Sequence, residues 1–177
     1  MNIIFKQATA EELEHALEFF KLASLSLEEK RVSQWNYWTD PPEDKINWVK
    51  EGFNKGEFFF VENETGDKIA MFRLLQHDTL YWDEKGLEAK VRYVHSLVVR
   101  PDFSGLGIGK AVMLKIINNL KSEGVKKFRL DCDGSNPRLC TYYEAYGFKK
   151  VGEKITKYAT NNLYEMSLSY NDTLKKS

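Results

Sequence analysis

The sequence predicts an α/β fold in which one domain is built on a mixed sheet. The first half of the chain combines helices with an antiparallel hairpin pattern, and the second half alternates strands with helices. The length of 177 residues suits one domain, at ~150 residues per domain. We place this domain over residues 1–170 and a polar C-terminal tail over residues 171–177.

The first half of the chain is predicted to carry a strand, two helices and two further strands. Residues 3–7 form a short apolar strand. Thr9, with Glu12 three residues later, gives the capping-box pattern that starts a helix. A second helix is expected over residues 43–56, where apolar side chains recur at helical spacing. An antiparallel hairpin follows, with strands over residues 57–62 and 68–75 and a polar turn between them.

The second half alternates strands and helices after a polar excursion over residues 76–90. The expected elements are a strand over 91–99, a helix over 108–124, a strand over 127–132, a helix over 137–146, and strands over 148–157 and 163–169. The full order is then strand, two helices, three strands, helix, strand, helix and two strands. A chain with this order belongs to the mixed α/β class.

The charges of the chain balance. It has 26 Lys and Arg against 26 Asp and Glu, so its formal net charge at pH 7 is zero. This balance argues against a protein that binds nucleic acid or membrane surfaces by bulk attraction. Four basic residues are not interleaved with aromatic ones, and we expect them to form a solvated edge: Lys121, Lys126, Lys127 and Arg129.

The sequence also predicts a cytoplasmic protein that holds no metal. It shows no signal-peptide pattern and no stretch near the ~18 apolar residues of a membrane span. Cys132 and Cys140 match no zinc or redox spacing. We therefore expect both to be reduced thiols.

A glycine-rich turn lies between a predicted strand and a predicted helix. Residues 104–110 read Ser-Gly-Leu-Gly-Ile-Gly-Lys. Three alternate glycines let backbone N–H groups converge without obstruction by Cβ atoms, and the helix start adds the positive end of its dipole. The turn therefore predicts a pyrophosphate site built from the backbone. Its spacing fits neither the P-loop nor the dinucleotide-binding fingerprint.

Two stretches of the sequence resemble a known family. Residues 98–111 resemble the acetyl-CoA motif of the GCN5-related N-acetyltransferases, and Asn136 with residues 142–148 resembles that family's second signature. The order of elements agrees over almost the whole chain. The resemblance implies an acetyl-CoA N-acyltransferase-like fold. It also implies an enzyme that moves the acetyl group of acetyl-CoA to a primary amine of a small molecule, peptide or protein.

The resemblance further implies which residues bind acetyl-CoA. The backbone of the strand would pair with the pantetheine arm, the turn would hold the pyrophosphate, and Asn136 would hydrogen-bond the arm. The implied residues are Leu97, Val98, Val99, Ser104, Gly105, Leu106, Gly107, Ile108, Gly109, Lys110, Asn136 and Tyr143. Ser104 departs from the family pattern, which usually has Arg or Gln there.

Acetyl transfer to an amine needs a proton acceptor for the ammonium group and a proton donor for the departing thiolate. Tyr143 holds the family position of the donor. His95 is the first candidate base because its ordinary pKa is ~6.5, and it predicts an acidic limb near pH ~6–7 in the rate profile. Asp131 is a rival base, and His77 ranks third. A packed sheet histidine, and a water chain in place of any single base, both remain open.

The acceptor site of this family usually involves the loops that are aromatic and acidic in this chain. The candidate contacts are Trp35, Trp38, Tyr81 and Trp82, with the acidic Asp78, Asp83, Glu84 and Glu88 nearby. Such a pocket would suit a cationic amine. The alternative is that the aromatic side chains pack under their loops or at a homodimer contact, while the acidic ones are solvated. An inactive module of the same fold that only binds CoA is the alternative function.

Overall fold

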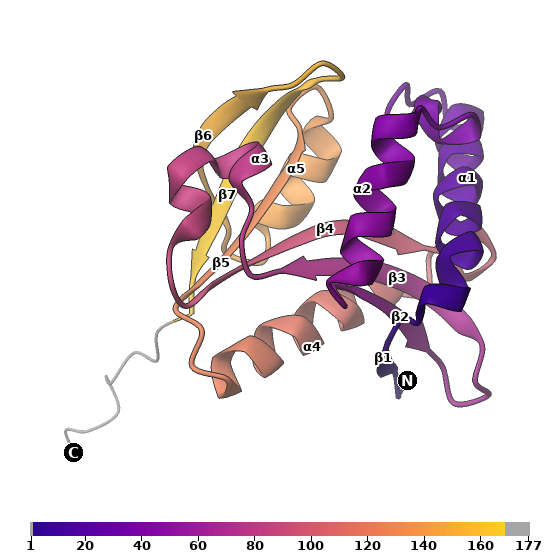
Figure 1. The fold of residues 1–177 in the computed structure, drawn as a ribbon, viewed down its shortest axis with the longest axis horizontal. Coiled ribbons are helices and arrows are strands. Elements are labelled where there is room, and N and C mark those ends of the chain that lie inside the picture. Colours follow the sequence, from indigo (N-terminus) through magenta and orange to yellow (C-terminus); the bar gives the residue numbers. More distant parts are fainter. Residues whose placement is uncertain (1, 169–177) are drawn as a thin grey trace. The chain divides into compact units, whose positions relative to one another are not determined.

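The computed structural model describes residues 2–168 and contains a seven-stranded mixed sheet (Figure 1). The strand order is β1-β2-β3-β4-β5-β7-β6. The predicted mixed α/β class and the predicted order of elements are confirmed. The tail predicted over residues 171–177 lies outside the described residues. No helix within residues 2–168 is long and apolar enough to cross a membrane.

The elements have the following bounds. The strands are β1 (Ile4–Gln7), β2 (Phe58–Glu62), β3 (Lys68–Leu75), β4 (Val91–Val99), β5 (Lys127–Asp133), β6 (Lys149–Ile155) and β7 (Thr160–Ser167). The α-helices are α1 (Leu13–Glu29), α2 (Glu43–Asn54), α3 (Thr79–Trp82), α4 (Ile108–Ser122) and α5 (Pro137–Glu144). The one addition to the predicted α-helices and strands is α3, a single turn inside the stretch expected as a polar excursion.

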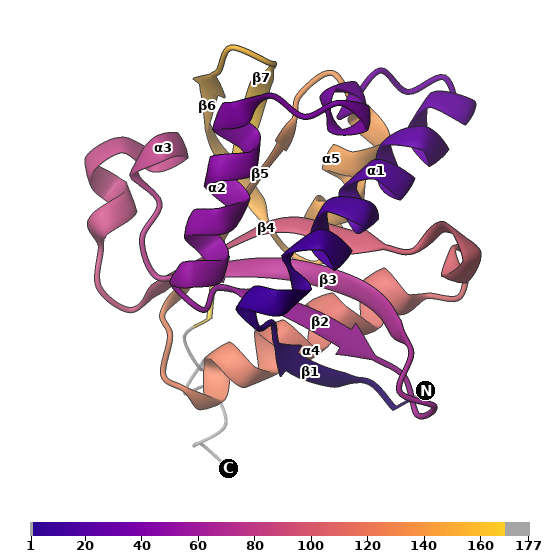
Figure 2. The same ribbon diagram turned by 45° about the vertical axis from the view of Figure 1, so that its right-hand side comes forward.

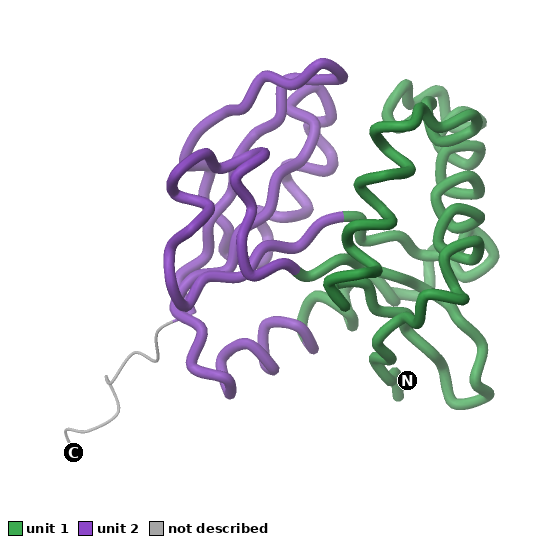
Figure 3. Tube along the Cα trace, viewed as in Figure 1, with its two compact units in different colours: residues 1–74, 96–114 green, residues 75–95, 115–177 purple. Residues whose placement is uncertain are grey.

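The chain divides into two compact units, each made of two segments (Figure 3). Unit 1 comprises residues 1–74 and 96–114, and unit 2 comprises residues 75–95 and 115–177. Both β4 and α4 therefore contribute one part to each unit. The single domain expected over residues 1–170 stays a prediction.

Unit 1 is an antiparallel three-stranded arrangement of β1, β2 and β3, with α1 and α2 on one face of these strands (Figures 1 and 2). The predicted capping box is present, since the Thr9 N–H donates to Glu12 Oε2 at 2.8 Å ahead of α1. The apolar face of α1 buries Phe20, whose ring stacks on Trp38 with centroids 3.9 Å apart. Phe58 and Phe60 of β2 join the same core cluster, so one aromatic layer holds helices and strands together.

Unit 2 combines a parallel strand pair with two antiparallel pairs. β4 pairs with β5 in parallel from Val91 with Lys127 to Val94 with Leu130. β5 then pairs antiparallel with β7, and β7 pairs antiparallel with β6. Paired residues on adjacent strands project to the same face of the sheet. The side chains of β4, β5 and β7 therefore form rows across these three strands.

The row that contains Arg129 shows that the solvated edge predicted for this residue is wrong. Arg129 is not part of a solvated edge, because its side chain is only 3% exposed. Its guanidinium donates to Glu165 Oε2 at 2.8 Å, to Glu88 Oε1 at 2.7 Å and to the hydroxyl of Tyr93 at 2.9 Å. It also lies over the ring of Trp82, 4.6 Å from the centroid. A buried guanidinium needs such partners, and the sheet register supplies two of them.

The aromatic layer of unit 1 predicts a stability change. Replacing Phe20 by Ala should lower the free energy of unfolding by about 3–5 kcal/mol, because a cavity replaces a fully buried ring. Urea denaturation measures this loss. Leu25→Ala on the same helix is the control, since Leu25 is 40% exposed and should change stability by less than about 0.5 kcal/mol. Equal effects of the two substitutions would contradict the described packing.

Candidate active site

The glycine-rich turn of unit 1 has the geometry of an anion site. Gly105 and Gly107 have φ angles of +80° and +74°, in the left-handed region that favours glycine. The first backbone hydrogen bond after the turn runs from the Ala111 N–H to the Gly107 carbonyl at 3.0 Å. The N–H groups just before Ala111 therefore have no partner within the helix. Together with the dipole of α4, they can bind a phosphate.

The space beside the Cα atoms of Gly105 and Gly107 is also open. A Cβ atom built on Gly105 or Gly107 meets no atom within 4 Å in the described part of the chain. The nearby guanidinium of Arg100 is already paired with the carboxylate of Asp102. The turn thus offers peptide dipoles and an exposed Lys110, which fits the pyrophosphate of CoA in spite of Ser104.

The last residues of β4, before this turn, differ in burial. Val98 is buried in the core cluster of unit 1, whereas the side chains of Leu97 and Val99 are half-buried. Ser96, at the start of this segment, has a φ of +56°. Such a left-handed residue interrupts the regular alternation of a strand.

In unit 2 the parallel register brings together the two rival bases predicted from the sequence. His95 and Asp131 directly follow Val94 and Leu130, the last pair of the β4–β5 register. Since residues at equivalent places in parallel strands share a face, the two side chains meet. His95 Nδ1 lies 3.1 Å from Asp131 Oδ1. The sequence alone presented these residues as alternatives, but in the structure they are one group.

A second carboxylate reaches His95 from the connection that leads into α3. Asp78 Oδ2 lies 2.8 Å from His95 Nε2. The side chains of Asp78, His95 and Asp131 are 3%, 8% and 6% exposed. The ring of Tyr81 lies over the imidazole with centroids 5.1 Å apart. His95 is therefore a buried ring between two carboxylates.

The charge of His95 follows from these neighbours. Burial by itself lowers the pKa of the imidazole, since it penalises the charged form. The two carboxylates of Asp131 and Asp78 outweigh burial and raise the pKa of His95 to about 10. His95 is accordingly an imidazolium at neutral pH. The group of three side chains then carries a net charge of −1.

The same three side chains are near enough to one another to be considered as metal ligands. Each offers an atom within 4.8 Å of the others. A metal would need an unprotonated imidazole nitrogen, whereas a carboxylate faces each nitrogen of His95 and favours the protonated ring. We therefore interpret the group as an ion-paired cluster.

Helix α5 in unit 2 carries the other predicted site residues. Asn136 is its N-cap, and the side-chain oxygen accepts from the Leu139 N–H at 3.1 Å. The role predicted for Asn136 in binding the cofactor arm stays a prediction. The neighbouring hydroxyls of Tyr146 and Tyr142 are hydrogen-bonded to each other at 3.0 Å.

Tyr143 is half-buried on α5, and its ring contacts the rings of Tyr142 and Phe148. Burial raises the pKa of Tyr143, and the nearby Cys132 and Asp131 raise it further. The hydroxyl is therefore protonated at neutral pH. Cys132 and Cys140 are free and buried, with Sγ atoms 3.7 Å apart. Burial also raises the pKa of the Cys132 thiol, which disfavours the reactive thiolate.

The four aromatic residues predicted to contact the acceptor fall into two pairs. Trp38 is buried in the core cluster of unit 1, and Trp82 is buried in the core cluster of unit 2. Burial gives each of them a packing role, and a substrate role stays untested. Trp35 and Tyr81 are half-buried.

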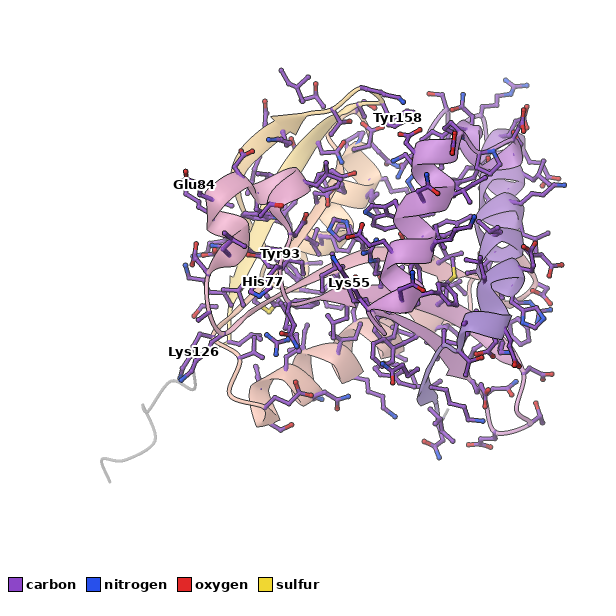
Figure 4. All side chains as sticks on the ribbon, viewed as in Figure 1. Lys55, His77, Glu84, Tyr93, Lys126 and Tyr158 are labelled. Atoms are coloured by element: carbon purple, nitrogen blue, oxygen red, sulfur yellow. The ribbon has the colours of Figure 1, made fainter. Side chains whose placement is uncertain are left out.

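Asp78 is the residue whose importance the sequence did not indicate. The sequence offers it only as one of four acidic residues that either line an acceptor pocket or are solvated, whereas it is buried against His95. The only sequence signal is local, because an Asp ahead of Thr79 suits a helix N-cap, and its Oδ1 does accept from the Tyr81 N–H. His77, the third candidate base, is exposed on the connection between β3 and α3 (Figure 4).

Comparisons with known proteins place the chain in a family. The model of the acetyltransferase (GNAT) family matches residues 13–148. The chain is 35% identical over 107 residues to mycothiol acetyltransferase of Propionibacterium freudenreichii, covering 60% of this chain and 32% of that longer relative. It is 31% identical over 117 residues to glucosamine 6-phosphate N-acetyltransferase of Schizosaccharomyces pombe, covering 65% of this chain and 99% of the relative.

A solved structure shares the fold. The chain superimposes on a GNAT-family acetyltransferase from Listeria monocytogenes with a TM-score of 0.75 and 21% identity. The superposition covers 93% of this chain and 94% of the other. At this identity the likeness concerns the fold alone.

The buried cluster predicts how stability depends on pH. The folded pKa of His95, about 10, exceeds the ordinary value of 6.5, so the folded state binds more protons between these values. The stabilisation is complete below pH ~6.5 and is lost as the pH rises through about 10. The free energy of unfolding should fall with a slope of up to about 1.4 kcal/mol per pH unit from this group. Urea denaturation of wild type and His95→Gln measures the slope, which should be shallower in the variant. Parallel curves would show that His95 is not held protonated by the fold.

Proposed function

The chain belongs to the acetyltransferase (GNAT) family, and we propose that it is an acetyl-CoA-dependent N-acetyltransferase. Its acceptor is a primary amine of a small molecule, a peptide or a protein. The observation that carries the proposal is the glycine turn, with Gly105 and Gly107 in left-handed conformation directly ahead of α4. This turn falls within the residues that match the family.

The acceptor class follows from the relatives and from charge. One relative is named for N-acetylation of glucosamine 6-phosphate, whose reacting group is an amine. In this chain the Asp78–His95–Asp131 cluster has a net negative charge, which favours a cationic ammonium group over a neutral or anionic acceptor. The half-buried ring of Tyr81, whose centroid lies 5.1 Å from that of His95, is suited to contact a cation in the same unit.

Bound acetyl-CoA supplies a thioester, whose C–S bond breaks as the amine nitrogen forms the new C–N bond. Tyr143 is proposed as the general acid for the departing thiolate. Its raised pKa supports this role, because a phenol that stays protonated at neutral pH has a proton to give and is a poor base.

The ammonium proton has two proposed acceptors within one group. His95 can act as the base only after losing its own proton, so its raised pKa of about 10 moves the expected acidic limb from pH ~6–7 to higher pH. The second proposed acceptor is Asp131, whose buried Oδ1 is ion-paired with His95 Nδ1 at 3.1 Å.

Two observations favour the alternative of a module that binds CoA without turnover. Ser104 stands where the family usually has a longer polar side chain, and His95 is protonated at rest. Release of free thiol from acetyl-CoA with a panel of amines separates the two proposals. Binding of acetyl-CoA without thiol release by any amine would leave only the alternative.

The general-acid role of Tyr143 predicts a kinetic effect. Tyr143→Phe should lower kcat by about 10²- to 10⁴-fold, because the ring is kept and the proton is lost, while KM for acetyl-CoA changes little. Initial rates of thiol release at varied acetyl-CoA concentration measure kcat and KM. Tyr158→Phe is the control, since Tyr158 lies at the tip of the β6–β7 hairpin (Figure 4). An unchanged kcat in Tyr143→Phe would exclude the role.

The glycine turn predicts a binding effect. Gly107→Val should weaken acetyl-CoA binding at least tenfold (about 1.4 kcal/mol), because a β-branched residue at a φ of +74° strains the turn and moves its N–H groups. Titration calorimetry measures the affinity. Gly66→Val imposes the same strain at a φ of +86° in the β2–β3 turn and should leave the affinity unchanged. Unaltered affinity in Gly107→Val would refute the turn as the pyrophosphate site.

A further inference from the structure

We infer that Asp78 is the positioning residue of His95: its carboxylate fixes the orientation of the imidazole and keeps the ring charged. The part that Asp78 plays in acetyl transfer rests on the proposed function above. The charge of His95, in contrast, can be measured in the resting protein without turnover. The inference concerns a residue outside both family motifs, on the connection between β3 and α3.

The carboxylate of Asp78 is itself held rigidly. Its Oδ1 accepts from the Tyr81 N–H at 3.3 Å, and its backbone N–H donates to the Gly86 carbonyl at 3.1 Å. A Cβ atom at Gly86 would lie 2.2 Å from the carbonyl oxygen of Asp78, so only glycine allows this close approach. The loop over residues 78–86 is therefore folded around Asp78, and its second oxygen, Oδ2, is left to face His95 Nε2 at 2.8 Å.

The opposite carboxylate is held by a different element. Asp131 Oδ2 accepts from Asn161 Nδ2 at 2.5 Å, so β7 fixes Asp131 while the α3 connection fixes Asp78. The titratable groups facing His95 are then Asp78 and Tyr81 from the α3 segment and Asp131 from β5. Two anchored carboxylates on the two ring nitrogens determine the plane of the ring.

The two carboxylates have separate consequences for the reaction. The negative charge of Asp131 acts on Tyr143, the proposed acid, as well as on His95. Both oxygens of Asp78 are engaged, one by the Tyr81 N–H and one by His95. Asp78 therefore acts through the ring of His95 and sets how readily that ring gives up its proton.

The test measures the ionisation of His95 directly. In full-length protein labelled with ¹⁵N-histidine, without acetyl-CoA or acceptor, NMR follows the ring of His95 over pH; His95→Gln assigns the signal. The wild type should titrate near pH 10. Asp78→Asn should lower the midpoint by about 1–3 pH units, because an opposite charge is removed while the cap to Tyr81 is retained. Asp67→Asn, which removes one charge from the β2–β3 turn, is the control and should leave the midpoint unchanged.

Kinetics then test the role in catalysis. With acetyl-CoA and the amine found by the thiol-release panel, the acidic limb of kcat/KM should move to lower pH in Asp78→Asn by the same shift as the NMR midpoint. KM for acetyl-CoA should not change. A merely structural role of Asp78 would lower the rate at every pH without moving the limb.

Each outcome decides the inference. An equal midpoint in wild type and Asp78→Asn overturns it, and a midpoint that moves while the limb stays overturns its role in acetyl transfer. If no amine gives thiol release, the proposed function fails and the NMR titration alone decides the charge of His95. Should Asp78→Asn not fold, Asp78→Ser removes the charge and keeps an oxygen that can cap the Tyr81 N–H, and a midpoint unchanged from wild type overturns the inference.

Discussion

The parallel register of β4 and β5 is the constraint on which the candidate active site of unit 2 depends. By pairing Val94 with Leu130, it places the next residues, His95 and Asp131, on the same face of adjacent strands. A shift of one residue would turn one of these side chains to the other face of the sheet. The chemistry of the site is therefore fixed by backbone hydrogen bonds before any side-chain contact is considered.

The same register explains why unit 2 tolerates buried charge. One row of the sheet joins Tyr93, Arg129 and Glu165, and two residues further along the strands another row joins His95 and Asp131. A buried charge is costly unless it is paired and hydrogen-bonded, and adjacent strands supply partners at fixed spacing. In the first row, the charge of Arg129 is paired with Glu165 of β7 and with Glu88 of the loop ahead of β4. The row that holds His95 and Asp131, together with Asp78, keeps a net negative charge.

Much of the fold could be read from local patterns. Periodicity gave β3 and β4 with the same bounds as the structure and the other strands within three residues, because alternation and turns are local properties. The capping box at Thr9 and the glycine turn were likewise visible in the sequence. Helix α3 has no periodic stripe that would predict it, because it is a single turn, Thr79–Trp82, capped by Asp78. Arg129 was assigned to a solvated edge because charged residues are usually exposed, and nothing local reveals which partners surround one that is not.

The sequence by itself determined the family, the mixed sheet and the residue types of an acetyl-transfer site, since motifs and periodicity depend on neighbours along the chain. It presented His95 and Asp131 as competing bases and Asp78 as one acidic residue among several. Only the tertiary structure decided that these three side chains form one buried cluster and that the cluster raises the pKa of His95 to about 10. The physical reason is that a pKa depends on burial and on charges a few ångströms away, and these are set by strand register and loop packing rather than by sequence separation.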